Sequence, residues 1–171
     1  MCIRDRHIEF RPRRGKAAAL RFIQQLATSS AWDVPLPASR EQQPAVHALR
    51  RLRQVTRPGS LLVLLSDFRF LDDDCRGQLV ELARHNDVVM IHCYDPLERV
   101  LPPPGRYRVT DGSSSVNLDA ANPGLRAEYQ ERFQRQQQAL TRLCQELGLH
   151  QIDIATDDDM LLKLKTGLGL Q

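Results

Sequence analysis

The sequence lacks the long apolar runs and the aromatic content that mark several large protein classes. Only 5% of its 171 residues are aromatic. No stretch approaches the roughly 18 uninterrupted apolar residues that a membrane-spanning helix needs. The start, MCIRDRHIEF, also lacks the apolar core of a secretion signal. These absences predict a cytoplasmic protein that makes no membrane contact through this chain.

The usual marks of metal, redox and nucleotide chemistry are missing as well. The four cysteines contain no CxxC pair and the five histidines no HxxxH or HExxH spacing, which argues against a zinc site and a disulfide framework. The chain has no GxGxxG, GxxxxGK[ST] or GxSxG motif. Dinucleotide binding, P-loop hydrolysis and a nucleophile elbow are therefore not indicated.

The net charge is small but unevenly distributed. Residues 1–60 contain 12 Lys and Arg against 4 Asp and Glu, whereas residues 61–171 contain 12 against 17, so the two parts carry +8 and −5. The basic runs RPRRGK and HALRRLRQ are not interleaved with aromatic residues. Because single-strand nucleic-acid surfaces combine positive charge with stacking rings, we expect no nucleic-acid partner.

Aliphatic runs alternate with helical stripes along the chain. Strands are predicted at 7–10, 60–68, 87–95 and 150–159, helices at 16–27, 44–55, 73–84, 123–147 and 159–169, and a surface hairpin from 107–110 and 116–119. The runs SLLVLLSDF and DVVMIHCYD are continuously apolar, which is typical of strands buried on both faces of a parallel sheet. The pattern predicts one α/β domain with a mostly parallel sheet flanked by helices.

Each of three predicted strands ends in oxygen-bearing residues. These are Ser66 and Asp67, Tyr94 and Asp95, and Thr156 and Asp157. Ligands of open parallel sheets bind beyond the carboxyl ends of the strands, and carboxylate and hydroxyl oxygens suit Mg²⁺. A structural role is the alternative for each: Asp72 or Asp73 can cap the next helix, Asp95 precedes a proline, and Asp157 precedes a helix.

Two further patterns could suggest a functional site, but their sequence context argues against one. Asp111, Ser113 and Ser115 match D-x-S-x-S, but RYRVTDGSSSVNLD has no buried strand before the motif and predicts a hairpin tip. Cys93 and His92 are neighbours on a predicted strand, where successive side chains point to opposite faces. They therefore cannot form a thiol–imidazole pair, and His92 is expected to be packed or at the surface.

Several segments together resemble a known family. They are GSLLVLLSDFRFLDDD, LARHNDVVMIHCYDPLERVLPPPGRYRVTDG, LRAEYQERFQRQQQALTRLC and IATDDDMLLKL. From His7 onward they are similar to the carboxy-terminal part of the MoxR-associated bacterial proteins called domain of unknown function fifty-eight. The resemblance implies a three-layer, Rossmann-like fold of the von Willebrand factor A type. It also implies a gene beside a MoxR-type AAA+ ATPase, and a role as a binding or adaptor partner rather than an enzyme.

The same resemblance implies an incomplete site. In that fold a DxSxS loop after the first strand, a threonine and an aspartate hold the metal, and only the aspartate maps here, onto Asp67 with Ser66 beside it. We expect residues 1–6 to be a non-native leader and residues 7–171 an amino-terminally truncated domain, with 7–10 a mid-sheet strand. The SLLVLL strand at 60–65 would then have a free apolar edge. Mg²⁺ would belong to a full-length parent, and this fragment is expected to hold no cofactor.

Two functional hypotheses follow from these observations. The first is a non-enzymatic interaction module that binds a MoxR-type AAA+ ATPase, or its client, through Ser66, Asp67, Asp95 and Asp157. The second is a Mg²⁺-dependent nuclease or phosphatase whose Asp67, Asp95 and Asp157 converge on one ion. The second requires carboxylates within a few ångströms of each other.

Overall fold

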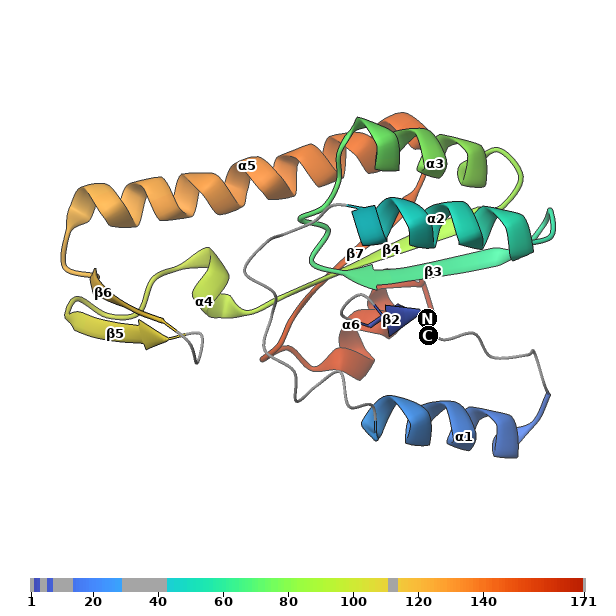
Figure 1. The fold of residues 1–171 in the computed structure, drawn as a ribbon, viewed down its shortest axis with the longest axis horizontal. Coiled ribbons are helices and arrows are strands. Elements are labelled where there is room, and N and C mark those ends of the chain that lie inside the picture. The colour runs from blue at the N-terminus through green and yellow to red at the C-terminus, as the bar shows by residue number, and fades with distance from the viewer. Residues whose placement is uncertain (1, 4–5, 8–13, 29–42, 111–113, 171) are drawn as a thin grey trace.

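A three-stranded parallel sheet forms the centre of the protein (Figure 1). The computed structural model describes residues 2–3, 6–7, 14–28, 43–110 and 114–170. β4 (Asp87–Tyr94) lies between β3 (Leu61–Ser66) and β7 (His150–Ala155), and both pairings are parallel. The predicted α/β class with a parallel sheet is confirmed.

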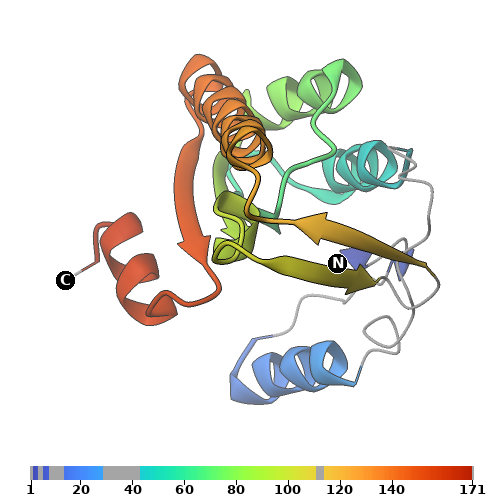
Figure 2. The same ribbon diagram turned by 90° about the vertical axis from the view of Figure 1, so that its left-hand side faces the viewer.

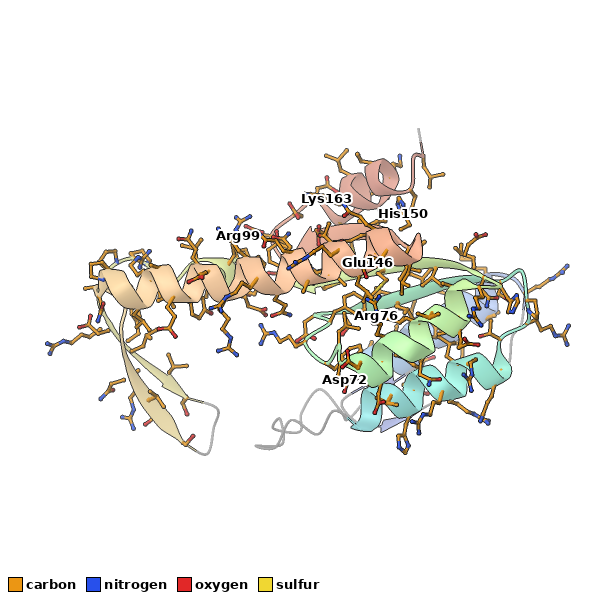
Figure 3. All side chains as sticks on the ribbon, turned by 90° about the horizontal axis from the view of Figure 1, so that it is seen from above. Asp72, Arg76, Arg99, Glu146, His150 and Lys163 are labelled. Atoms are coloured by element: carbon orange, nitrogen blue, oxygen red, sulfur yellow. The ribbon has the colours of Figure 1, made fainter. Side chains whose placement is uncertain are left out.

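Three helices cover one face of this sheet. α2 (Gln43–Val55), α3 (Asp73–Ala83) and α5 (Pro123–Leu147) all lie on the same side (Figure 1). Even-numbered residues of β3 and β4 point toward them because side chains alternate along a strand. The main core therefore consists of Val46, Leu49, Leu62, Phe68, Cys75, Leu79, Leu82, Val88, Met90, Leu140, Leu143, Cys144 and Leu149. At the edge of this layer Arg76 of α3 forms an ion pair of 2.8 Å with Glu146 of α5 (Figure 3).

The opposite face of the sheet is covered only in part. α6 (Met160–Gly167) lies over β4 and β7, where Val89, Ile91, Ile152 and Ile154 form a second, smaller core with Leu164. The outward side chains of β3 remain exposed, with relative accessibilities of 64% for Leu61, 46% for Val63 and 66% for Leu65. The prediction that this strand is buried on both faces is therefore wrong, because no helix of the described residues packs on its second face.

Local signals account for most helix boundaries. Asp72 caps α3 by accepting a 2.8 Å hydrogen bond from the Cys75 amide. Asp95 caps α4 (Pro96–Arg99), a short helix that the proline-rich sequence did not suggest, through the Leu97 amide at 2.8 Å. Gly148 ends α5 in the left-handed conformation with φ of 65°, as its sequence position predicts.

A projecting arm extends from the sheet. β5 (Arg106–Thr110) and β6 (Ser115–Asp119) form the predicted antiparallel hairpin, at the far end of α5 from the sheet (Figure 1). Arg126 of α5 holds its base by donating to the carbonyls of Pro102 at 2.6 Å, Ala120 at 3.1 Å and Leu101 at 3.3 Å. The guanidinium thus satisfies three carbonyls on the two segments that flank the hairpin and lie outside its ladder.

The predictions for the amino-terminal segment lie only partly within the described residues. Arg6–His7 (β2) pairs with Cys2–Ile3 (β1) in a separate antiparallel sheet, so His7 does not join the central sheet as predicted, and residues 8–10 lie outside the described residues. α1 (Lys16–Ala27) has no buried residue. Asp111 and Ser113 of the D-x-S-x-S match also lie outside the described residues, and Ser115 begins β6. Among the helices described here, none combines the length and apolarity needed to cross a membrane.

Candidate functional site at the carboxyl edge of the sheet

The carboxyl ends of β3, β4 and β7 meet along one edge of the sheet, because all three strands are parallel. We call this edge the rim and define it by the side chains that follow the strands: Ser66, Asp67, Arg69, Asp95, Glu98, Thr156 and Asp157. The ladder continues one step beyond the strands, since the Thr156 amide donates to the Tyr94 carbonyl at 3.0 Å.

Asp67 is held in a tight turn after β3. Its Oδ1 accepts from the Arg69 amide at 3.3 Å and from the Ser66 hydroxyl at 3.4 Å, and its backbone carbonyl accepts from Gln136 of α5 at 3.1 Å. Phe68 has a φ of 49° and is only 4% exposed, so the chain reverses while this ring enters the core. The Ser66 hydroxyl accepts from the Phe68 amide at 3.2 Å. The local role of Asp67 is therefore to stabilise this turn.

Arg69 joins two parts of the rim. Its Nε lies 3.4 Å from Asp67 Oδ2, and its Nη2 forms an ion pair with Glu98 of α4. Both carboxylates are partly exposed, with side-chain accessibilities of 44% and 32%. The guanidinium thus lies between two acidic groups from different elements and neutralises part of their charge.

The other end of the rim is formed by β4 and β7. The Thr156 hydroxyl donates to Asp95 Oδ2 at 3.5 Å, so these two predicted strand-end residues are brought together. Asp157 is exposed, whereas the next residue, Asp158, accepts from the Ala155 amide at 2.8 Å and lies 3.4 Å from Lys163 Nζ. The Ala155 hydrogen bond, assisted by Lys163, lowers the pKa of Asp158 below its usual value. The sequence pattern pointed to Asp157 and missed that its neighbour makes these contacts.

The rim aspartates do not form a metal cluster. Within the part of the chain that the structure describes, which includes Asp67, Asp95 and Asp157, no three His, Cys, Asp or Glu side chains come together in an arrangement able to hold an ion. Asp67 is bound to Arg69 and Asp95 caps α4. The nuclease or phosphatase hypothesis required these three carboxylates to converge, and they do not.

Sequence reasoning missed a buried polar pair beneath the rim. The register places Ser66, His92 and Asp153 side by side on adjacent strands. His92 is 2% exposed, and its Nδ1 donates to Asp153 Oδ1 at 2.9 Å. Its ring stacks against Tyr94 and Phe133, at centroid distances of 5.3 and 6.3 Å. The only sequence signal was the position of His92 on the same strand face as the core residue Met90.

The electrostatics of this pair favour the ionised carboxylate. Burial alone would raise the pKa of Asp153, but hydrogen bonds from His92 and from Gln151, at 2.9 Å and 3.0 Å, outweigh it and lower the pKa below the usual value. The Ser66 hydroxyl donates to Asp67 and accepts from the Phe68 amide rather than bonding to His92. The row of Ser66, His92 and Asp153 is therefore not assembled as a nucleophile with its base.

One comparison with known proteins identifies the chain. The family model described as protein of unknown function DUF58 matches residues 1–139. The chain belongs to this family. The DUF58 match covers β3, β4, the hairpin arm and most of α5, and ends before β7 and α6. No curated protein and no solved structure matches the chain.

Proposed function

We propose that this DUF58 chain is a non-enzymatic protein-interaction module that binds a partner protein through the rim. The observation that carries the proposal is the chain of exposed charged contacts at the carboxyl edge of the sheet, in which Arg69 links Asp67 to Glu98. Donors and acceptors from several elements are held there in one arrangement. A partner with complementary charges would thus meet side chains that are already ordered, which lowers the entropic cost of binding.

The composition of the rim supports a protein partner more than a small ligand. The shallow depression lined by Gln137, Gln138, Thr141 and Arg142 lies on α5 and includes none of the rim residues. Small-molecule sites are usually enclosed and mostly apolar. The rim instead consists of charged and hydroxyl side chains that are partly open to water, a composition common at the periphery of protein interfaces.

The partner that fits the family resemblance is a MoxR-type AAA+ ATPase, or a client protein of that ATPase, and the proposed fold type is that of von Willebrand factor A domains. In such domains a DxSxS loop, a threonine and an aspartate together hold a metal ion. Here Asp67 is the one matching ligand, and its carboxylate is already paired with Arg69. A single paired carboxylate offsets little of the dehydration of Mg²⁺, so we propose that this chain binds its partner without metal.

The test is a binding titration of the full chain against a purified MoxR-type AAA+ ATPase, with and without Mg²⁺. Asp67→Asn keeps an oxygen for the Arg69 amide but removes the charge. It should weaken binding about tenfold, which corresponds to about 1.4 kcal/mol. Asp87→Asn is the matched control, because Asp87 is exposed at the opposite end of β4.

The outcomes separate the parts of the proposal. Equal affinity of Asp67→Asn and wild type would exclude the rim as the binding surface. Absence of binding by the wild-type chain would remove this ATPase as the partner. An affinity that requires Mg²⁺ would contradict the metal-independent form of the proposal.

A further inference from the structure

One stripe of α5 reaches two backbone segments of the rim. The Gln136 side chain donates to the Asp67 carbonyl at 3.1 Å, and the Tyr129 hydroxyl donates to the Leu97 carbonyl of α4 at 2.9 Å. Gln136 and Tyr129 are about two helical turns apart, which places them on the same face of α5. Phe133 lies between them on this face and is 7% exposed, so the stripe packs against the sheet. One helix therefore holds both the turn after β3 and α4.

α4 depends on contacts with other elements for its position. It has only four residues, and helices this short are not stable in isolation. Asp95 accepts from the Leu97 amide at 2.8 Å, while Tyr129 donates to the carbonyl of the same residue. Figure 2, which looks along α5, shows α4 directly beside it. The backbone of α4 is thus held from two sides, immediately before Glu98.

The two segments that α5 holds carry the two carboxylates that bind Arg69. Asp67 Oδ2 lies 3.4 Å from Arg69 Nε, and Glu98 forms an ion pair with Arg69 Nη2. Ion pairs that are partly open to water contribute little on their own to holding a segment in place. The backbone hydrogen bonds from Gln136 and Tyr129 therefore decide whether both carboxylates stay beside the guanidinium.

We propose that Tyr129 and Gln136 are positioning residues of the rim, which hold Glu98 and Asp67 on either side of Arg69 in the geometry that the partner binds. Because this role is defined by partner binding, it rests on the function proposed for the rim. Loss of the Tyr129 hydroxyl frees the Leu97 carbonyl, so Glu98 leaves Arg69 for part of the time. Binding must then order α4 as well, which lowers the affinity.

The first test measures amide hydrogen exchange in the free protein. The amides of Glu98 and Val100 close the turn of α4 through hydrogen bonds of 2.8 and 3.0 Å. Tyr129→Phe keeps the ring and should accelerate their exchange about two- to tenfold, the effect of one lost hydrogen bond. Tyr107→Phe is the matched control, because the Tyr107 hydroxyl also donates to a carbonyl at 2.9 Å, that of Pro103. It should leave exchange in α4 as in wild type.

The second test measures affinity for a purified MoxR-type AAA+ ATPase. Tyr129→Phe should weaken binding about two- to tenfold in the wild-type background and have no effect in the Glu98→Ala background. A hydroxyl that supported only overall stability would lower the affinity equally in both backgrounds. Gln136→Met keeps the length of the side chain and removes its amide, and its effect should disappear in the same way in the Asp67→Asn background. Tyr107→Phe should bind as wild type does.

The outcomes separate this proposal from the proposed function. Exchange in α4 that Tyr129→Phe leaves unchanged would overturn the positioning role, whether or not the ATPase binds. Equal losses of affinity with and without the Glu98 carboxylate would overturn it as well. Absence of binding by the wild-type chain would instead remove the ATPase as the partner, and the exchange measurement would still decide whether Tyr129 holds α4 in place.

Discussion

Removal of the Asp153 carboxylate tests whether the polar pair beneath the rim stabilises the fold. In Asp153→Ala, the Nδ1–H of His92 loses its acceptor at 2.9 Å, while the imidazole stays 2% exposed between Tyr94 and Phe133. A buried donor left without a partner costs about 1–3 kcal/mol. The Asp153 side chain is 36% exposed, so water can reach the vacated position and reduce that cost. We therefore expect a loss of about 1–2 kcal/mol in the free energy of unfolding.

A double-mutant cycle isolates the interaction. His92→Leu and Asp153→Leu each leave one polar group unpaired, whereas the double variant removes both and should be less destabilised than the sum of the two. Urea unfolding at pH 7, followed by circular dichroism, measures all four proteins. Asp157→Ala is the control, because Asp157 is exposed, and should change stability by less than about 0.5 kcal/mol. Strict additivity, or a loss in Asp153→Ala no larger than in the control, would refute the reasoning.

The Asp153 carboxylate should also make the free energy of unfolding depend on pH, in a direction that follows from its lowered pKa. Its pKa in the folded protein lies below the ordinary value of 3.8, so the unfolded chain binds a proton more readily. The stabilisation from Asp153 is therefore fully present above about pH 5 and is lost as the pH falls through the folded pKa. Unfolding curves from pH 6 to pH 2.5 should show a flatter loss of stability in Asp153→Ala than in wild type. Parallel curves would contradict this assignment.

Two further predictions concern the helix ends and the arm. Gly148 has a φ of 65°, so Gly148→Ala should lower the free energy of unfolding by about 1 kcal/mol, measured in urea, and an unchanged midpoint would contradict the left-handed C-cap. Arg126→Ala removes three hydrogen bonds to carbonyls at the base of the hairpin. Amide exchange in β5 and β6 should accelerate while β4 stays protected, and unchanged exchange in the hairpin would show that Arg126 does not anchor it.

The sequence by itself determined the type and order of the main elements, because these depend on local and periodic properties. The continuous apolar runs of β3 and β4 indicated parallel strands, the stripe from Leu125 to Leu147 indicated a long helix, and Gly148 its end. The ends of β3 and β4 could be predicted because their apolar runs stop at Ser66 and Tyr94. That these strand ends lie at one edge of the sheet followed from the parallel pairing alone. That β3 lies at an edge of the sheet formed by the described strands was also expected.

Only the tertiary structure decided which side chains meet across elements. His92 and Asp153 are 61 positions apart in the sequence, and their pairing depends on the register between β4 and β7. The contact of Arg69 with Glu98 depends on the turn at Phe68 and on the short helix α4, and no periodic pattern in the sequence indicated that helix. The exposure of Val63 could not be predicted without knowing where on the sheet α6 packs. Periodicity reports the face on which a residue lies, whereas its partner is selected by strand register and by the layers that pack against that face.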